Sequence, residues 1–200
     1  MGVRLNHQDD LQDKANEMLY VALLHYPVYN KNGAVVTTAI ANMDIHDIAR
    51  TVKTYAAGGF YIVNPIEEQR SLAQEIVHHW REGYGARYNP FRRAAFELIK
   101  IEKSLQAVLD DIIDRTGRQP KTIVTGAKFT ENVLKYAELQ SLLKNGHCDY
   151  LLIFGTGSGI SDELINASDF KLESIKGASG YNHLSVRSAV AIILDRIMRV

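Results

Sequence analysis

The strongest constraint on the fold is a regular alternation of short apolar runs with segments of helical periodicity. The runs at 19–24 and 150–154 are apolar almost throughout, as expected of strands that are covered on both faces. Strands are predicted at 19–24, 34–38, 60–63, 121–125, 150–154 and 170–175. Segments with an apolar residue every three or four positions predict helices at 44–55, 67–81, 94–116, 131–144 and 162–167. Strands that alternate with helices predict an α/β fold, with a mostly parallel sheet and helices on both faces.

Polar and glycine-rich stretches divide the chain between these elements. Residues 1–18 form a polar lead-in, and 19–200 are long enough and apolar enough for one domain with a single core. Gly83-Tyr84-Gly85 is expected to break the chain after the helix at 67–81. The stretch 88–93 is expected to be a loop that carries two aromatic rings beside two arginines.

Composition restricts the class of protein. Lys plus Arg equals Asp plus Glu, at 23 each, so the bulk charge gives no sign of nucleic-acid binding, although a local basic patch stays open. A single cysteine, Cys148, leaves no intrachain disulfide. No window reaches the roughly 18 apolar residues of a membrane span. We therefore expect a soluble, cytoplasmic protein with no membrane partner.

The carboxyl-terminal segment joins a polar loop to a strongly apolar helix. From Ala189 to Leu194 the helix has little polar surface, so we expect it to be buried against the sheet, a second subunit or both. Asn182 is the expected N-cap, and Arg196 and Arg199 suit the negative end of the helix dipole. The small, polar loop before the helix predicts one wall of a ligand site.

Three of the predicted strands end in short sequences that expose the backbone. These are Thr125-Gly126-Ala127, Gly155 to Ile160, and Ile175 to Asn182. Ligands of parallel sheets bind at the carboxyl ends of the strands, and glycine lets the backbone approach them closely. The same glycines also suit tight strand-to-helix connections that hold no ligand, so both interpretations remain open.

The glycine-rich turn at 155–159 does not match the known nucleotide-binding loops. It lacks the G-x-G-x-x-G spacing, and no following strand ends in an acidic residue placed to bind a ribose. A G-x-x-x-x-G-K-[ST] sequence is absent, and the adjacent His78 and His79 diverge on a helix and cannot share a metal. These observations disfavour an NAD-dependent oxidoreductase, exclude a P-loop NTPase and predict no metal site.

Three segments carry recognisable motifs: 44–51, then 151–160, a strand that runs into a glycine-rich loop, and finally 180–196, a loop that leads into the terminal helix. In this order they resemble the first, second and third motifs of the SPOUT superfamily of α/β-knot, S-adenosylmethionine-dependent RNA methyltransferases. In that superfamily the loop before the terminal helix is knotted. More narrowly, most of 19–200 resembles a small bacterial group of RNA methyltransferases in that superfamily.

The resemblance implies a deep trefoil knot at the carboxyl terminus and S-adenosylmethionine as the cofactor. It also implies an RNA substrate (tRNA or rRNA) and a homodimer that buries the terminal helix and the knot. Backbone groups of small residues would read the adenine. The implied cofactor-binding residues are Thr125, Gly126, Phe154, Gly155, Thr156, Gly157, Gly159, Ile160, Ile175, Gly177, Asn182, His183 and Leu184.

The same resemblance implies a catalytic set made up of Asp44, Arg50, Ser185 and Arg187. Arg50 matches the motif arginine and could hold an RNA phosphate, or it could form an ion pair with Asp47. Asp44 could act as a general base or as a helix cap. Ser185 and Arg187 could face the pocket or be polar residues of the first helical turn, with Arg187 the better candidate for binding acceptor RNA across the dimer.

Departures from the motifs leave the acceptor open between a ribose hydroxyl and a base atom. Asp44 and His46 stand where ribose-methylating enzymes have Asn and Gly, and a motif Glu is missing from 155–159. A methyltransferase with a non-RNA acceptor, and a catalytically idle knot protein that binds cofactor or RNA, remain as alternatives. The rings and arginines of 88–93 could stack on RNA and neutralise it, or they could cover the long helix.

Overall fold

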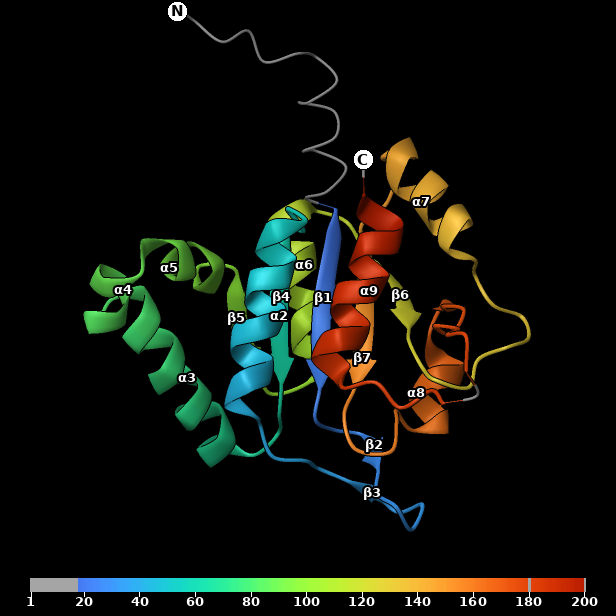
Figure 1. Cartoon of the computed structure of the whole chain (residues 1–200), viewed down its shortest axis with the longest axis horizontal. Helices are drawn as coiled ribbons and strands as arrows, with labels where there is room; N and C mark the ends of the chain where they lie inside the picture. The colour runs from blue at the N-terminus through green and yellow to red at the C-terminus, as the bar shows by residue number, and fades with distance from the viewer. Residues whose placement is uncertain (1–17, 180, 200) are drawn as a thin grey trace, which may run out of the picture.

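A six-stranded parallel sheet forms the centre of the protein (Figure 1), in a computed structural model that describes residues 18–179 and 181–199. The strand order is β5-β4-β1-β7-β6-β8, and every neighbouring pair is parallel. The strands are β1 (Leu19–Leu24), β4 (Gly59–Val63), β5 (Ile99–Glu102), β6 (Lys121–Val124), β7 (Tyr150–Gly155) and β8 (Phe170–Lys171). A separate antiparallel hairpin pairs β2 (Val28–Tyr29) with β3 (Val35–Val36).

Helices cover both faces of this sheet. They are α2 (Asn42–Thr54), α3 (Glu67–Arg81), α4 (Tyr84–Tyr88), α5 (Pro90–Phe96), α6 (Leu105–Thr116), α7 (Tyr136–Asn145), α8 (Asp162–Ala167) and α9 (Val186–Met198). In Figure 1, α2 and α9 lie side by side in front of the sheet and α6 lies behind it. The predicted α/β fold, with a parallel sheet and helices on both faces, is confirmed.

Strand β1 lies in the middle of the sheet, and all six of its residues are apolar and buried. Its odd-numbered residues, from Leu19 onward, pack with α2 and α9, and its even-numbered residues pack with α6. Side chains alternate between the two faces of a strand, so a fully apolar run fits only a strand covered on both sides. Its neighbours β4 and β7 run in the same direction, so the carboxyl ends of the three strands meet at one edge.

The prediction of one long helix at 94–116 is wrong. The segment contains the end of α5, strand β5 and helix α6. Ile99 and Ile101 alternate with charged residues, and parallel pairing with β4 outweighs the helical spacing of the apolar residues around them. The side chain of Ser104 accepts a hydrogen bond from the Ala107 amide at 3.2 Å, which marks the true start of α6.

The predictions of a loop at 88–93 and of a break at 83–85 are also wrong in part. Asn89 caps α5 by accepting from the Arg92 amide at 2.9 Å, and Pro90 occupies the first helical position. Gly85 lies inside α4, where an added Cβ would come within 2.7 Å of the Trp80 ring. Glycine is therefore needed at this position because α4 packs closely on the end of α3.

Several element boundaries differ from the prediction. Helix α7 begins at Tyr136 rather than at residue 131, and β8 and β3 have two residues each. Ser185, not Asn182, caps α9, accepting from the Ser188 amide at 3.4 Å. Asp44 is not a helix cap, because it lies in the first turn of α2 after the N-cap Ala41. Helices α3 and α8 have the predicted bounds.

The polar lead-in at 1–18 lies, apart from the buried Met18, outside the described residues. Within the described part of the chain, no helix has both the length and the apolar character that a membrane crossing requires.

Candidate functional site

The glycine-rich loop after β7 is held by the β2–β3 hairpin. The Ser158 amide donates to the Tyr29 carbonyl at 2.7 Å, and the Tyr29 amide donates to the Gly159 carbonyl at 2.8 Å. Gly157 has a φ of +60°, and a Cβ there would lie 2.7 Å from the Tyr29 oxygen. At Gly155 a Cβ would meet the Ile160 side chain at 2.5 Å. These two glycines are therefore required by contacts within the protein itself.

A buried polar chain connects this loop to the ends of the central strands. His25 Nδ1 is hydrogen-bonded to Thr38 Oγ1 at 3.0 Å, and Thr38 Oγ1 in turn contacts Thr156 Oγ1. Asn64 Nδ2 donates to the Thr38 carbonyl at 3.1 Å. His25 is 1% exposed, and its Nε2 has no hydrogen-bond partner among the described residues. Burial lowers the pKa of His25 to about 4, so the ring is neutral at pH 7.

Three residues of this hydrogen-bonded group were not predicted from the sequence, namely His25, Thr38 and Asn64. A signal was present, because His25 directly follows β1 and Asn64 directly follows β4. Polar side chains at the carboxyl ends of adjacent parallel strands meet at one edge of the sheet. Thr38 carried no comparable signal, since it follows a two-residue strand that is not part of the main sheet.

The loop after β6 lies against the segment that leads to α9. Ser174 Oγ donates to the Gly126 carbonyl at 2.8 Å, and Asn182 Nδ2 donates to the Ala127 carbonyl at 2.9 Å. Thr125 Oγ1 donates to the Ile153 carbonyl of β7 at 3.0 Å. Two of the three predicted loop segments, those after β6 and β8, are thus in direct contact.

The remaining predicted cofactor residues differ in how far they are exposed. The Phe154 side chain is in the core, so only its backbone can face a ligand. His183 is exposed and its ring meets the Tyr181 ring edge-on, with centroids 5.3 Å apart. Leu184 is exposed as well, whereas Ile175 is half-buried. A Cβ at Gly159 or Gly177 would meet nothing within 4 Å. Open backbone of this kind fits a ligand that is bound largely by main-chain groups.

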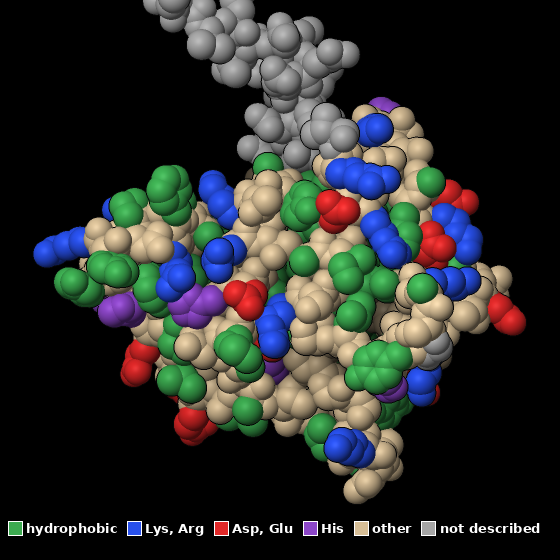
Figure 2. Space-filling view, viewed as in Figure 1, with side chains coloured by type: hydrophobic (Ala, Val, Ile, Leu, Met, Phe, Trp, Pro, Cys, Tyr) green, Lys and Arg blue, Asp and Glu red, His purple; other side chains and the backbone are tan. Residues whose placement is uncertain are grey.

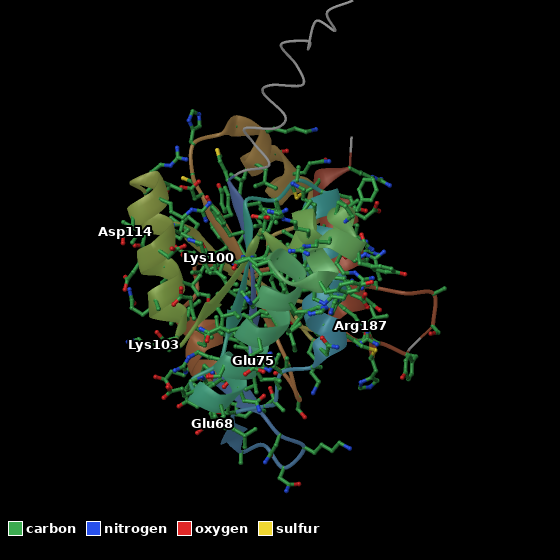
Figure 3. All side chains as sticks on the ribbon, turned by 90° about the vertical axis from the view of Figure 1, so that its left-hand side faces the viewer. Glu68, Glu75, Lys100, Lys103, Asp114 and Arg187 are labelled. Atoms are coloured by element: carbon green, nitrogen blue, oxygen red, sulfur yellow. The ribbon has the colours of Figure 1, made fainter. Side chains whose placement is uncertain are left out.

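Two of the four predicted catalytic residues, Asp44 and Arg187, are in contact between α2 and α9, and a third, Arg50, approaches only their neighbour Asp47. Arg187 Nη1 lies 3.2 Å from Asp44 Oδ1, and its Nε lies 3.5 Å from Asp47 Oδ2. Asp44 is buried, whereas the Arg50 side chain is 60% exposed and reaches Asp47 only at 4.0 Å. Arg187, labelled in Figure 3, thus reaches from the first turn of α9 to two carboxylates of α2. The fourth residue, Ser185, is the α9 cap and also contacts Ser188 Oγ at 2.8 Å.

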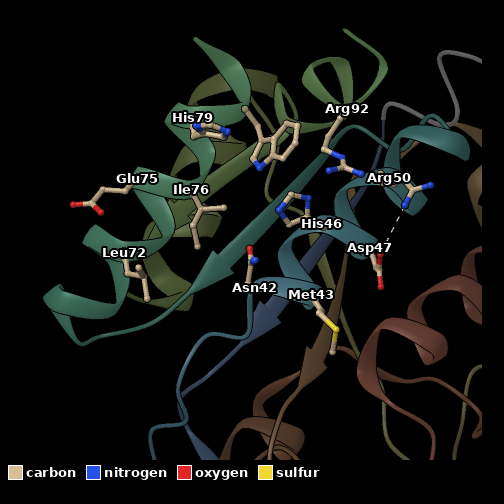
Figure 4. A pocket seen from close by; sticks show the side chains of 11 residues that line it. Asn42, Met43, His46, Asp47, Arg50, Leu72, Glu75, Ile76, His79 and Arg92 are labelled. Atoms are coloured by element: carbon tan, nitrogen blue, oxygen red, sulfur yellow. Dashed lines mark ion pairs between the residues drawn. The ribbon is translucent and has the colours of Figure 1, made fainter. Parts of the chain in front are cut away.

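A cavity of about 650 Å³ lies between α2, α3 and α5 and shares Asp47 and Arg50 with this charged group (Figure 4). The Arg92 guanidinium stands 4.4 Å from the centre of the Trp80 ring, and the His46 ring meets Trp80 edge-on at 5.3 Å. The pKa of His46 is lowered, first by burial and then by the positive charge of Arg92. The lining residues are Asn42, Met43, His46, Asp47, Arg50, Leu72, Glu75, Ile76, His79, Trp80 and Arg92.

Solved structures with a similar fold include proteins described as methyltransferases. The chain resembles a probable methyltransferase from Bordetella pertussis Tohama I, with a TM-score of 0.64, 11% identity and coverage of 94% of this chain and 97% of that chain. It also resembles the SpoU methyltransferase AviRb from Streptomyces viridochromogenes in complex with AdoMet, with a TM-score of 0.57, 15% identity and coverage of 92% and 58%. At these identities the likeness establishes the fold alone, which this chain shares with the SpoU methyltransferase AviRb.

Sequence comparison identifies the family. The family described as SAM-dependent RNA methyltransferase matches residues 18–199. A protein from Aquifex aeolicus, named an uncharacterized protein, is 42% identical over 91% of this chain and 89% of its own length. The chain therefore belongs to the family of S-adenosylmethionine-dependent RNA methyltransferases, as the three motifs indicated.

A second relative is named for its activity but is much longer. The tRNA (guanine-N(1)-)-methyltransferase of Nitratidesulfovibrio vulgaris is 41% identical over 94% of this chain, but the match covers 43% of that protein. The present chain thus spans less than half of the length of this relative. Its guanine-N1 activity is a property of the whole relative.

Proposed function

We propose that the chain methylates a nucleotide of tRNA or rRNA at a site between the strand-end loops and the α2–α9 junction. The observation that carries the proposal is the group of Asp44, Asp47, Arg50 and Arg187. Arg187 follows directly on the loop that is proposed to hold the methyl donor. The charged group and the donor loop are therefore joined through the first turn of α9.

In this proposal, the cofactor lies against Thr125 and Gly126, residues 154–160, and residues 175–184. The open backbone at Gly159 and Gly177 supports it, because a side chain there would occupy space that a ligand needs. The bracing of the loop by Tyr29, and the polar chain through Thr156, support a pocket wall that is already ordered before the cofactor binds. When bound, S-adenosylmethionine supplies an electrophilic methyl group.

The charged residues are proposed to divide the work of positioning the acceptor. Arg50 is exposed and only weakly paired, so it is free to bind an RNA phosphate. Arg187 holds Asp44 through Oδ1. The Asp44 carboxylate is thereby fixed to accept a hydrogen bond or a proton from the acceptor group. Ser185 acts through its cap of α9, which sets the position of Arg187.

We further propose a single domain over 19–200, a knotted carboxyl terminus and a homodimer in the cytoplasm. One buried cluster includes both Leu19 and Met198, which supports a single domain. The contacts of Gly126 and Ala127 with Ser174 and Asn182 support threading of the terminal segment past the loop after β6. Exposed Met43 and the half-buried Ile192 support burial of the α2–α9 face by a second copy.

The test combines binding and transfer. Calorimetry with S-adenosylhomocysteine measures the donor site, and transfer of tritiated methyl to RNA from a strain lacking the gene measures activity. Arg50→Ala is expected to reduce transfer at least about 100-fold, as loss of one transition-state contact does, with donor affinity unchanged. Lys53→Ala, another exposed cation on α2, is the matched control.

The outcomes separate the alternatives. Absence of heat with S-adenosylhomocysteine contradicts the proposed donor site, and heat without transfer indicates an idle binder. Full activity of Arg50→Ala removes that residue from the site. Digestion of the labelled RNA to nucleosides identifies the methylated atom and so distinguishes ribose from base.

A further inference from the structure

Helices α4 and α5 present three aromatic rings to solvent. Tyr84 is 73% exposed, Tyr88 is 74% exposed and Phe91 is 91% exposed. The Tyr84 and Tyr88 rings are stacked, with centroids 6.1 Å apart and an angle of 21° between their planes. Rings exposed to this extent contribute little to folding, so packing within the chain gives no reason for them.

The support beneath these rings is rigid. The backbone of α4 packs on Trp80 and His79 at Gly85, and Asn89 caps α5. The rings therefore stand on short helices that are fixed to α3, rather than on a free loop. Such a surface loses little conformational entropy when a flat ligand group stacks on it.

The same segment is basic. Residues 84–96 contain Arg87, Arg92 and Arg93 and no acidic residue. Arg87 and Arg93 are exposed beside the rings, and Arg93 also reaches Glu97 at 3.2 Å. Figure 2 shows hydrophobic side chains together with Lys or Arg and His side chains over α4 and α5, on the left of the view. Although the chain as a whole is neutral, this surface carries positive charge among aromatic rings.

This surface continues into the cavity between α2 and α3. Phe91 points to solvent, while the next residue, Arg92, lines the cavity over Trp80. His46 and Arg50 of α2 line the same cavity next to Arg92 (Figure 4). The cavity, at about 650 Å³, lies within the range of sizes that bind small organic ligands, and a nucleotide is a ligand of this size.

We propose that α4, α5 and this cavity form a binding surface for single-stranded RNA. Unpaired bases stack on Tyr84, Tyr88 and Phe91. Arg87 and Arg93 neutralise phosphates, and one nucleotide enters the cavity beside Arg92 and Arg50. This inference rests on the proposed function, because it assumes that the substrate is RNA. Stacking rings with interleaved arginines are what unstacked bases and their phosphates require. A protein partner or a second copy would instead have to offset three arginines with acidic groups.

The experiment measures RNA binding without cofactor. Fluorescence anisotropy with a fluorescein-labelled, unstructured RNA of about 12 nucleotides gives the affinity over a series of salt concentrations. The Tyr84→Ala/Tyr88→Ala double variant and Phe91→Ala are each expected to weaken binding about tenfold, since one stacked base corresponds to roughly 5- to 150-fold. Arg87→Ala is expected to weaken binding and to lower the salt slope by about one unit.

Matched controls lie away from this surface. Val35→Ala removes an exposed apolar side chain of the hairpin, and Lys144→Ala removes an exposed cation of α7. Both are expected to leave the affinity unchanged. Phe91→Tyr keeps a ring at the same position and is expected to keep wild-type affinity, which separates stacking from loss of folding.

Two results overturn the inference. One is wild-type RNA affinity in the aromatic variants. The other is dissociation of a dimer into monomers by Tyr84→Ala/Tyr88→Ala in sedimentation velocity, which would make this surface an interface between copies. Because the assay needs no donor, its failure is distinct from failure of the proposed methyl transfer: the surface can lack RNA affinity while the wild-type enzyme still methylates.

Discussion

The strand-end loops and the α3–α5 region differ in whether contacts within the protein explain their unusual residues. In the loops, Gly155 and Gly157 fit against Ile160 and Tyr29, so the chain itself accounts for them. In the α3–α5 region, Phe91 and its neighbouring rings contact solvent, and no packing within the described residues accounts for them.

Glycines and exposed aromatic residues therefore carry different kinds of evidence. A glycine indicates a close approach but does not say whether a ligand or the protein itself approaches. An exposed ring on a rigid helix has no such internal explanation and therefore indicates a binding partner outside the chain. The proposed cofactor site therefore rests mainly on the family and on open backbone, and the proposed RNA surface rests mainly on side chains.

The largest effect is expected where the loop is most tightly held. Gly157→Ala places a Cβ 2.7 Å from the Tyr29 oxygen at a φ of +60°. Left-handed backbone costs about 1–2 kcal/mol, and displacement of the hairpin raises the loss of unfolding free energy to about 3 kcal/mol. Donor affinity is expected to fall at least about tenfold. Urea denaturation and calorimetry measure the two quantities.

Gly117→Ala is the matched control for this change. Gly117 also has a positive φ, of +72°, but an added Cβ there would meet nothing within 4 Å. The Gly117→Ala variant should lose only about 1 kcal/mol of unfolding free energy, from its left-handed backbone, and should keep full donor affinity. Equal losses at both positions would show that Tyr29 does not constrain the loop.

A second effect concerns pH and the buried His25. Its pKa in the folded protein is about 4, below the value of about 6.5 for an unfolded chain. Between these values the unfolded state binds more protons, so the unfolding free energy falls as pH falls from about 6.5 to about 4. The loss from His25 amounts to about 3 kcal/mol. Denaturation at a series of pH values measures it.

His25→Gln removes the titration and is expected to flatten this dependence. His147→Gln, at an exposed histidine after α7, is the control and should leave the dependence unchanged. An unaltered slope in His25→Gln would assign the acid sensitivity to other groups.

A third, smaller effect is expected at the α2–α9 junction. Arg187→Met leaves the buried Asp44 carboxylate without its cation at 3.2 Å, at a cost of about 1–2 kcal/mol in unfolding free energy. The Asp44→Asn/Arg187→Met double variant is expected to recover part of this loss, because the unpaired charge is gone. A double-mutant cycle in urea tests the coupling, and strict additivity would argue against the ion pair.

The smallest effect is expected at the most exposed ring. Phe91→Ser should change the unfolding free energy by no more than about 0.5 kcal/mol, because the side chain is 91% exposed. Thermal unfolding measures it. A loss as large as that of Gly157→Ala would remove the contrast between the two regions.

Much of the fold could be predicted from local pattern. Continuous apolar runs located β1 and β7, and the helical spacing located α3 with its observed bounds. Strand β5 was missed because Ile99 and Ile101 also fit a helical spacing with their neighbours. Only its pairing with β4, a contact between distant parts of the chain, decides in favour of a strand.

The site could be predicted to a smaller extent. The motif resemblance pointed to Asp44 and Arg187, which lie 3.2 Å apart, and to Arg50, which approaches only their neighbour Asp47, while the catalytic roles of all three stay predictions. The link from His25 through Thr38 to Thr156 could not be predicted, because it joins residues whose contact depends on the path of the β2–β3 hairpin. The cavity was not predicted for a related reason. Residues 88–93 were predicted to be a loop, whereas Arg92 lies over Trp80 because it belongs to helix α5.

The central position of β1 has a consequence for how the protein is made. Tyr20 pairs with Gly59 in β4 and with Leu151 in β7, and more than a hundred residues separate the last pair. On the ribosome, β1 therefore emerges long before β7 and keeps one hydrogen-bonding edge open while the rest of the chain is synthesised. Open edges invite pairing with other chains, and distant strand pairs form slowly. Correct maturation is thus expected to depend on protection of this nascent half-sheet, for which chaperones are the usual means.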